Sequence, residues 1–135
     1  MRQINFKSNV SGKFEEVVEQ VTNSLKSEGF GILTRIDLHA KFKEKLDKLI
    51  APATILGACN PQLAYEAYLQ NSDVASLLPC NAVVREISPG TCSVELARPT
   101  AMMELLGDAA LVELSRDADL RLQRCLERLR SPQAA

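Results

Sequence analysis

The stretch NAVVREISPGTCSVELA, residues 81–97, decides the fold class of this chain. Its two ends, Asn81–Ile87 and Cys92–Ala97, are rich in the β-branched and apolar residues that strands favour. The four residues SPGT at 88–91, which separate them, are of the kind that forms a tight turn. The stretch therefore predicts a hairpin of two antiparallel strands.

Strand and helix patterns alternate on both sides of this hairpin. Short strands are predicted at Gln3–Lys7, Phe30–Ile36 and Ala53–Ala58. Between the first and the second of these strands we expect one helix that is capped by Ser11 and stopped at Gly29. Interleaved elements combined with an antiparallel hairpin predict an α+β domain. The other predicted helices cover residues 38–49, with Asp37 as cap and Leu38, Phe42, Leu46 and Leu49 on one face, then 61–70, 99–106 and 109–129.

Length and composition restrict the class of protein. The 135 residues suit one domain, which we expect over residues 1–130, with a disordered tail at 131–135. The net charge of −1 and the absence of tryptophan disfavour a nucleic-acid binder. No run approaches the ~20 apolar residues of a membrane-spanning helix. We therefore expect neither a nucleic-acid nor a membrane partner.

The four cysteines indicate the redox environment. Their spacing is irregular, and the first residues show no export signal. Such cysteines are typical of reduced thiols in the cytoplasm rather than of a disulfide framework. We therefore predict a cytoplasmic protein. Cys92 and Cys125 lie on apolar faces of predicted elements and are expected to belong to the core.

Two of the cysteines lie in turns, within GACNP at 57–61 and LLPCN at 77–81. Cys59 directly precedes Asn60, which with Pro61 starts a predicted helix. The positive end of that helix would lower the pKa of the Cys59 thiol, as a reactive, redox-active or persulfide-carrying cysteine requires. The alternative is a small buried side chain that closes the turn.

Cys80 is the second candidate, because the two segments can meet at neighbouring strand ends. Cys59 and Cys80 would then face one pocket, as a redox pair or as two ligands of a soft metal. A zinc site is not expected, since only His39 and scattered carboxylates could complete it, and we expect no cofactor. The amides of Asn60 and Asn81 either orient a ligand or hold a cap and a turn.

A row of lysines marks the outer face of the second predicted helix. These lysines attract either an anionic ligand or an acidic partner, or they form a solvated face. Glu44 and Asp47 favour the solvated face, because they can pair with Lys48 and Lys43 four residues apart. The lysines are Lys41, Lys43, Lys45 and Lys48.

Four segments in this order carry a family resemblance: EGFGILTRIDLHAKFKEKL at 28–46, ILGACNPQLAYEA at 55–67, LLPCNAVVRE at 77–86 and ARPTAMMELLG at 97–107. The chain resembles the prokaryotic domain-of-unknown-function 302 family from about Phe14 to Leu129. The resemblance implies a fold like that of TATA-binding proteins, a curved antiparallel sheet with helices packed on one face. It also implies a homodimer. It implies no activity, and a fold does not transfer DNA binding.

The sequence thus leads to two hypotheses about function. In the first, a homodimeric domain binds a small ligand or handles a sulfur group near Cys59 and Cys80, with Asn60 and Asn81 as polar contacts. In the second, the domain is a non-catalytic homodimeric or protein-interaction module, and the cysteine segments only build turns. Whether the protein is an enzyme is left open by the residues.

Overall fold

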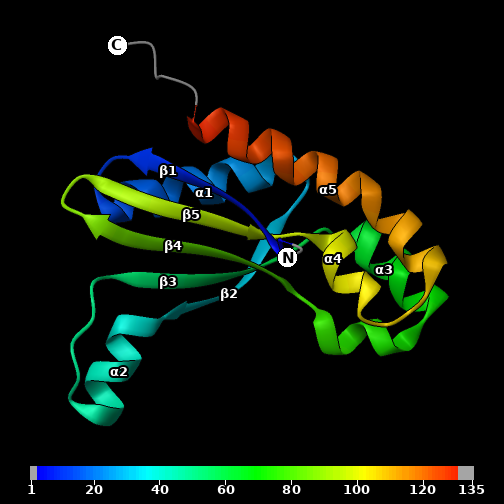
Figure 1. Cartoon of the computed structure of the whole chain (residues 1–135), viewed down its shortest axis with the longest axis horizontal. Helices are drawn as coiled ribbons and strands as arrows, with labels where there is room; N and C mark the ends of the chain where they lie inside the picture. The colour runs from blue at the N-terminus through cyan, green and yellow to red at the C-terminus, as the bar shows by residue number, and fades with distance from the viewer. Residues whose placement is uncertain (1–2, 131–135) are drawn as a thin grey trace.

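A five-stranded antiparallel sheet forms the centre of the computed structural model, which describes residues 3–130 (Figure 1). The strand order is β1-β5-β4-β3-β2, and the sheet is open rather than closed into a barrel. The predicted α+β class is therefore confirmed, while the likeness to TATA-binding proteins stays a prediction. The strands are β1 (Asn5–Ser11), β2 (Gly31–Asp37), β3 (Ala53–Cys59), β4 (Cys80–Ser88) and β5 (Thr91–Ala97).

Two long helices cover one face of the sheet, α1 (Phe14–Ser27) and α5 (Ala109–Arg130). The shorter α3 (Pro61–Gln70), the 3-10 helix η1 (Ser72–Leu77) and α4 (Pro99–Glu104) gather beyond one end of the sheet, beside the first turns of α5 (Figure 1). Helix α2 (Leu38–Leu46) follows β2 and contacts α1 at its start, where the His39 ring meets the Phe14 ring edge to face with their centroids 5.9 Å apart. No helix within residues 3–130 is long and apolar enough to cross a membrane. The tail predicted at 131–135 lies outside the described residues.

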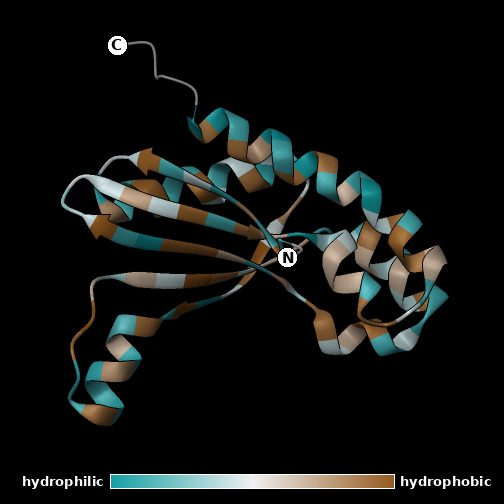
Figure 2. Cartoon of the chain, in the orientation of Figure 1, coloured by the Kyte–Doolittle hydropathy of each residue, from teal (hydrophilic) through white to brown (hydrophobic). Residues whose placement is uncertain are grey.

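The main core lies between the sheet and the two long helices. Hydrophobic and hydrophilic residues alternate along the strands and α5, as expected of elements with one buried side (Figure 2). Full burial of one such valine or leucine stabilises the fold by about 2 kcal/mol. The residues of this core with the least exposed side chains include Val17, Val21 and Leu25 of α1, Leu56, Val84 and Val94 of the sheet, and Leu122 and Cys125 of α5.

Helix α1 begins later than the sequence predicts. Ser11 is not its cap but the last residue of β1, where it pairs with Thr91 of β5. The backbone N–H of Gly12 then donates to the carbonyl of Gly90, at 2.9 Å, which fixes the hairpin turn to the start of the chain. Ser11 therefore extends β1 by pairing with β5 instead of capping helix α1. The predicted stop at Gly29 is confirmed, and this glycine adopts a φ of +87°.

Helix α2 is shorter than predicted and packs against little. It ends at Leu46, because Asp47 adopts a left-handed conformation that closes the last turn. Asp37 is its N-cap residue, but its carboxylate accepts hydrogen bonds from Thr54 and Arg35 instead of from the helix. No residue of α2 is buried. Leu49, which was predicted to continue its apolar face, lies beyond the helix and is 82% exposed.

The segment between α3 and β4, for which the sequence pattern predicts no helix or strand, contains helix η1. Its Val74 is fully buried and packs with Met103 and Leu111 in a second, smaller core. The side chain of Asn71 caps η1 by accepting from the Asp73 N–H, at 3.0 Å. A segment of six residues with a single buried side chain is too short to give a periodic signal, which is why the sequence pattern misses this element.

Candidate functional site

An apolar pocket of about 60 Å³ lies at the end of the sheet where β3 ends and β4 begins. Helices α3, α4 and α5 and residues of η1 supply its other walls. The lining includes one residue from each of the four segments that carry the family resemblance: Phe30, Cys59, Cys80 and Met103. No charged side chain within residues 3–130 lines it. The two cysteine segments therefore meet at one pocket, as predicted.

Close packing at Gly57 holds the two cysteine segments in place. A Cβ atom on Gly57 would lie only 2.3 Å from Thr34 Oγ1 and 2.8 Å from Pro79 Cγ. Because Gly57 has no side chain, Pro79 and Thr34 of β2 can pack directly against its backbone. This contact lies two residues before Cys59 and one before Cys80, so it sets where both cysteines enter the pocket wall.

Asn60 caps helix α3, as predicted for a cap followed by proline. Its Oδ1 accepts the Leu63 N–H at 3.1 Å, and the residue is 9% exposed. The Nδ2 group lies against Gly29, where an added Cβ would approach it to 2.9 Å. The turn after α1 thus packs on the start of α3. Asn60 remains part of the pocket lining while it fulfils this structural role.

Burial raises the pKa of both thiols in this pocket. Burial raises the pKa of Cys59, so the lowering expected from the helix end is wrong. The Asn60 side chain already occupies an N–H at that helix end, and apolar surroundings disfavour a thiolate. Burial, with smaller contributions from the charges of Cys59 and Asp119, raises the pKa of Cys80 to about 11. Both thiols are therefore protonated at neutral pH.

Comparison with known proteins places the chain in a family. The family described as "Domain of unknown function DUF302" matches residues 6–129. The chain belongs to the DUF302 family. A crystal structure of an uncharacterized conserved DUF302 protein from Bacillus stearothermophilus is 35% identical and superposes with a TM-score of 0.88. That likeness covers 96% of this chain and 100% of the other. No curated protein matches.

Asn81, the fourth predicted site residue, does not line the pocket of this DUF302 domain. It directly opposes Gly57 in the β3–β4 ladder and is exposed. Because side chains alternate along a strand, Asn81 points away from the face that Cys80 shares with Ala58. The pocket therefore brings together Cys59, Asn60 and Cys80 but not Asn81.

The lone histidine lies away from the cysteines. His39 Nδ1 accepts the Ala53 N–H at 3.1 Å, at the start of β3, whereas Cys59 ends that strand. Within residues 3–130, no cluster of three or more metal-ligating side chains occurs. Cys92 and Cys125 are fully buried in the core, as predicted. This arrangement provides no histidine that could activate a pocket thiol.

Two lysines of α2, Lys41 and Lys43, form ion pairs on a solvated face of the DUF302 domain. Lys43 pairs with Asp47, as the four-residue spacing predicts. Glu44 pairs with Lys41 at 3.6 Å instead of with Lys48. All of these side chains are more than half exposed, so the pairs contribute little to stability.

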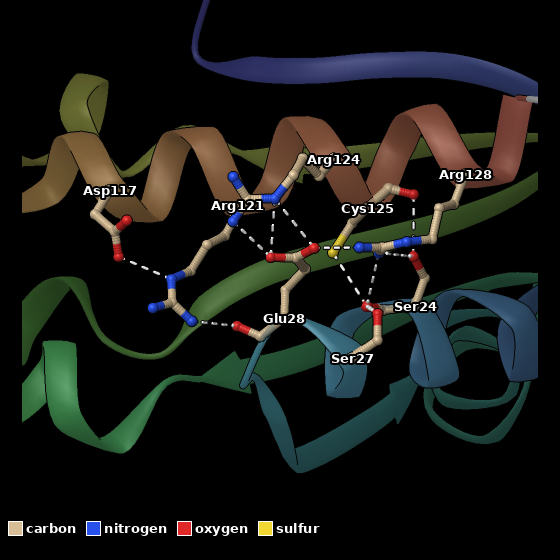
Figure 3. Close-up of polar contacts among 8 residues, drawn as sticks. All are labelled: Ser24, Ser27, Glu28, Asp117, Arg121, Arg124, Cys125 and Arg128. Carbon is tan, nitrogen blue, oxygen red and sulfur yellow. Dashed lines mark hydrogen bonds and ion pairs between the residues drawn. The ribbon is translucent and has the colours of Figure 1, made fainter.

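A charged cluster beside the pocket was missed by sequence reasoning. The carboxylate of Glu28, only 8% exposed, accepts hydrogen bonds from Arg124, at 2.8 Å, and from Arg128 (Figure 3). These bonds, above all the one from Arg124, lower its pKa to about 2 against the opposing effect of burial. Arg121 donates to the Glu28 carbonyl at 2.9 Å. The spacing of the arginines on α5 is visible in the sequence. Their acidic partner, Glu28, could not be inferred, because it lies 96 residues away from Arg124.

The same cluster joins α5 to α1 and to the pocket. Ser24 Oγ donates to the Cys125 carbonyl at 3.1 Å, and Cys125 Sγ donates to the Ser24 carbonyl at 3.3 Å (Figure 3). Arg121 Nη1 would lie 3.3 Å from a Cβ on Gly29, the residue on which Asn60 packs. The cluster therefore fixes the turn that supports one wall of the pocket.

Proposed function

We propose that this DUF302 domain binds a small ligand in the pocket between β3, β4, α3, α4 and α5, with Cys59 and Cys80 in its wall. One observation carries the proposal: each of the four segments that carry the family resemblance contributes to the lining of this single pocket. Segments that only built turns would not need to converge on one cavity. Apolar pockets with a few polar groups are the usual form of small-molecule sites.

The thiols support binding rather than covalent chemistry. The nucleophile in cysteine chemistry is the thiolate, and both pocket thiols have a raised pKa. Protonated cysteines instead provide polarisable, weakly hydrogen-bonding walls. A sulfur-containing ligand would therefore be held by contact with these side chains, without an activated nucleophile.

Filling the pocket tests this proposal. Ala64 of α3 lines it, and we expect Ala64→Leu to occupy much of its volume. In a thermal-shift screen of small metabolites, a pocket ligand at 100 times its dissociation constant adds about 2.7 kcal/mol of stability. We expect the screen to find ligands that raise the Tm of the unaltered protein and do not change the Tm of Ala64→Leu.

The matched control is Ala110→Leu, the same substitution at an exposed position of α5 outside the pocket. This variant should respond to ligands as the unaltered protein does. A screen in which every stabilising compound acts equally on Ala64→Leu and Ala110→Leu would contradict a function of this pocket.

We also propose that the domain forms a homodimer through α2 and the sheet face that α1 and α5 leave uncovered. Ile36, Ile55 and Val83 oppose one another across β2, β3 and β4, and therefore form an apolar row on one face. It is not the face that carries buried Leu56, because side chains alternate along β3. Leu49, just after α2, is 82% exposed.

Charges placed on this surface test the homodimer. We expect the unaltered protein to have the mass of two chains by light scattering after size exclusion, and Leu49→Asp to have the mass of one. Leu120→Asp is the control, since Leu120 is 54% exposed on α5. It should remain dimeric. An unaltered protein with the mass of a single chain would exclude the proposal.

A further inference from the structure

The apolar pocket has an inner wall and a mouth that differ in exposure. Phe30, Ala58 and Met103 of the inner wall are almost completely shielded from solvent. Leu114 of α5 is the most exposed residue of the lining, at 37%. Ala64 of α3 is half-buried. The pocket therefore opens to water between α3 and α5, so a bound molecule has one end inside and one end at this mouth.

The inner end of the pocket offers no partner to a charged group. No charged side chain among the described residues lines the pocket. Its polar side chains are engaged elsewhere, since Ser115 Oγ donates to the Val112 carbonyl at 2.8 Å and Asn60 caps α3. The raised pKa of the Cys80 thiol agrees, because burial here disfavours a negative charge. An ionised group at the inner end would therefore be buried without a partner.

Small side chains line the passage between the mouth and the inner wall. Ala64 and Ala67 line it from α3, and Ser115 and Ala118 line it from α5, the helix that α3 contacts. The thioether of Met103 adds a polarisable, apolar surface to the inner wall. An alkyl chain suits such a passage, because it presents only methylene groups to the apolar walls.

We infer that the ligand is an amphiphilic molecule whose uncharged alkyl end enters the pocket between α3 and α5, while its polar end stays in water at the mouth beside Leu114. The inference rests on the proposed function and specifies its ligand class. A charge is tolerated only at the outer end, because water solvates it there. Each methylene group that enters the pocket increases the affinity about fourfold.

Three six-carbon probes that differ only at their ends test the ligand class. Hexanol has one neutral polar end, hexanoate has one charged end, and adipate is charged at both ends. Each is titrated into the full chain at neutral pH while the methyl NMR signals of Met103, in the inner wall, and of Leu114, at the mouth, are recorded. We expect hexanol and hexanoate to bind with similar affinity, and adipate to bind about tenfold more weakly or less, because one of its charges must enter the pocket. Adipate that binds as tightly as hexanoate would overturn the inference.

Substitutions at the mouth test where the polar end lies. Leu114→Lys adds a positive charge beside the mouth, and Leu114→Gln is the matched control that removes the same apolar side chain without a charge. We expect the ratio of hexanoate affinity to hexanol affinity to be about threefold higher in Leu114→Lys than in Leu114→Gln at low ionic strength. An equal ratio in the two variants would contradict a polar end at the mouth.

The outcomes separate this inference from the proposed function. Adipate that binds tightly to the unaltered protein but not to pocket-filling Ala64→Leu would overturn the ligand class and leave a ligand-binding pocket. Hexanoate that binds equally to Ala64→Leu and to the control Ala110→Leu would overturn the inference, because it would bind outside the pocket. Absence of methyl shifts with all three probes would also overturn it, and the metabolite screen would then decide the function. If a Leu114 variant fails to fold, the comparison of hexanoate with adipate on the unaltered protein still decides the position of the charge.

Discussion

Replacing Gly57 with alanine is expected to lower the free energy of unfolding by about 3 kcal/mol, the upper range for an overpacked interior site. The added methyl group would lie 2.3 Å from Thr34 Oγ1 and 2.8 Å from Pro79 Cγ. The hydroxyl of Thr34 can rotate away, but the ring of Pro79 cannot bend. The end of β3 and the entry to β4 must therefore separate. Urea unfolding of Gly57→Ala against the unaltered chain measures the loss.

Two further variants make the explanation specific. Gly31→Ala adds the same methyl group on the neighbouring strand, where no atom lies within 4 Å, and is expected to leave stability unchanged or slightly higher. Thr34→Ala removes one of the two clashes, so it should restore part of the stability of Gly57→Ala. A Gly57→Ala variant as stable as Gly31→Ala would contradict the packing described at this site.

Replacing Glu28 with glutamine is expected to lower the free energy of unfolding by about 2 kcal/mol at neutral pH. The amide keeps the shape of the side chain but loses the charge that pairs with Arg124 and Arg128. Glu28 is only 8% exposed, so water replaces these bonds poorly. The arginines are about half exposed, which limits the loss. Chemical denaturation of both proteins at neutral pH measures the decrease in the free energy of unfolding.

The pH dependence identifies the charge as the cause. Pairing lowers the pKa of Glu28 from 4.5 to about 2 in the folded protein. Its stabilising contribution is therefore complete above pH 4.5 and disappears as the pH falls toward 2. The difference between the unaltered protein and Glu28→Gln should shrink across this window. The control Glu113→Gln, in an exposed pair with Arg116, should change neither stability nor its pH dependence. A difference for Glu28→Gln that stays constant from pH 6 to pH 3 would contradict this account.

Local patterns predicted the elements whose ends are determined by neighbouring residues. The turn SPGT and the pair Asn60–Pro61 define the β4–β5 hairpin and the start of α3 without help from the rest of the chain. Ser11 was assigned wrongly because its pairing partner, Thr91, is remote in the sequence. Helix η1 was missed for a similar reason, since Val74 is buried by Met103 and Leu111.

The candidate site was predicted in part. Cys59 and Cys80 line one pocket because their strands are neighbours, which the sequence could only suggest. Asn81 was predicted beside them but lies outside this pocket, because a step of one residue along a strand reverses the direction of the side chain. The shift in the pKa of Cys59 was predicted with the wrong sign, since burial raises this pKa. Burial depends on α4 and α5, which no local pattern around GACNP reveals.

The pairing of β1 with β5 bears on how the chain folds during synthesis. Within the described sheet, β1 has no hydrogen-bonded neighbour other than β5, and Asn5 faces Ala97. The ribosome must therefore add more than 80 residues after β1 before its partner strand exists. Helix α5, which closes the core, emerges later still. An exposed edge strand of this kind is prone to wrong pairing, so we expect folding intermediates of the nascent protein to depend on chaperones more than the finished domain does.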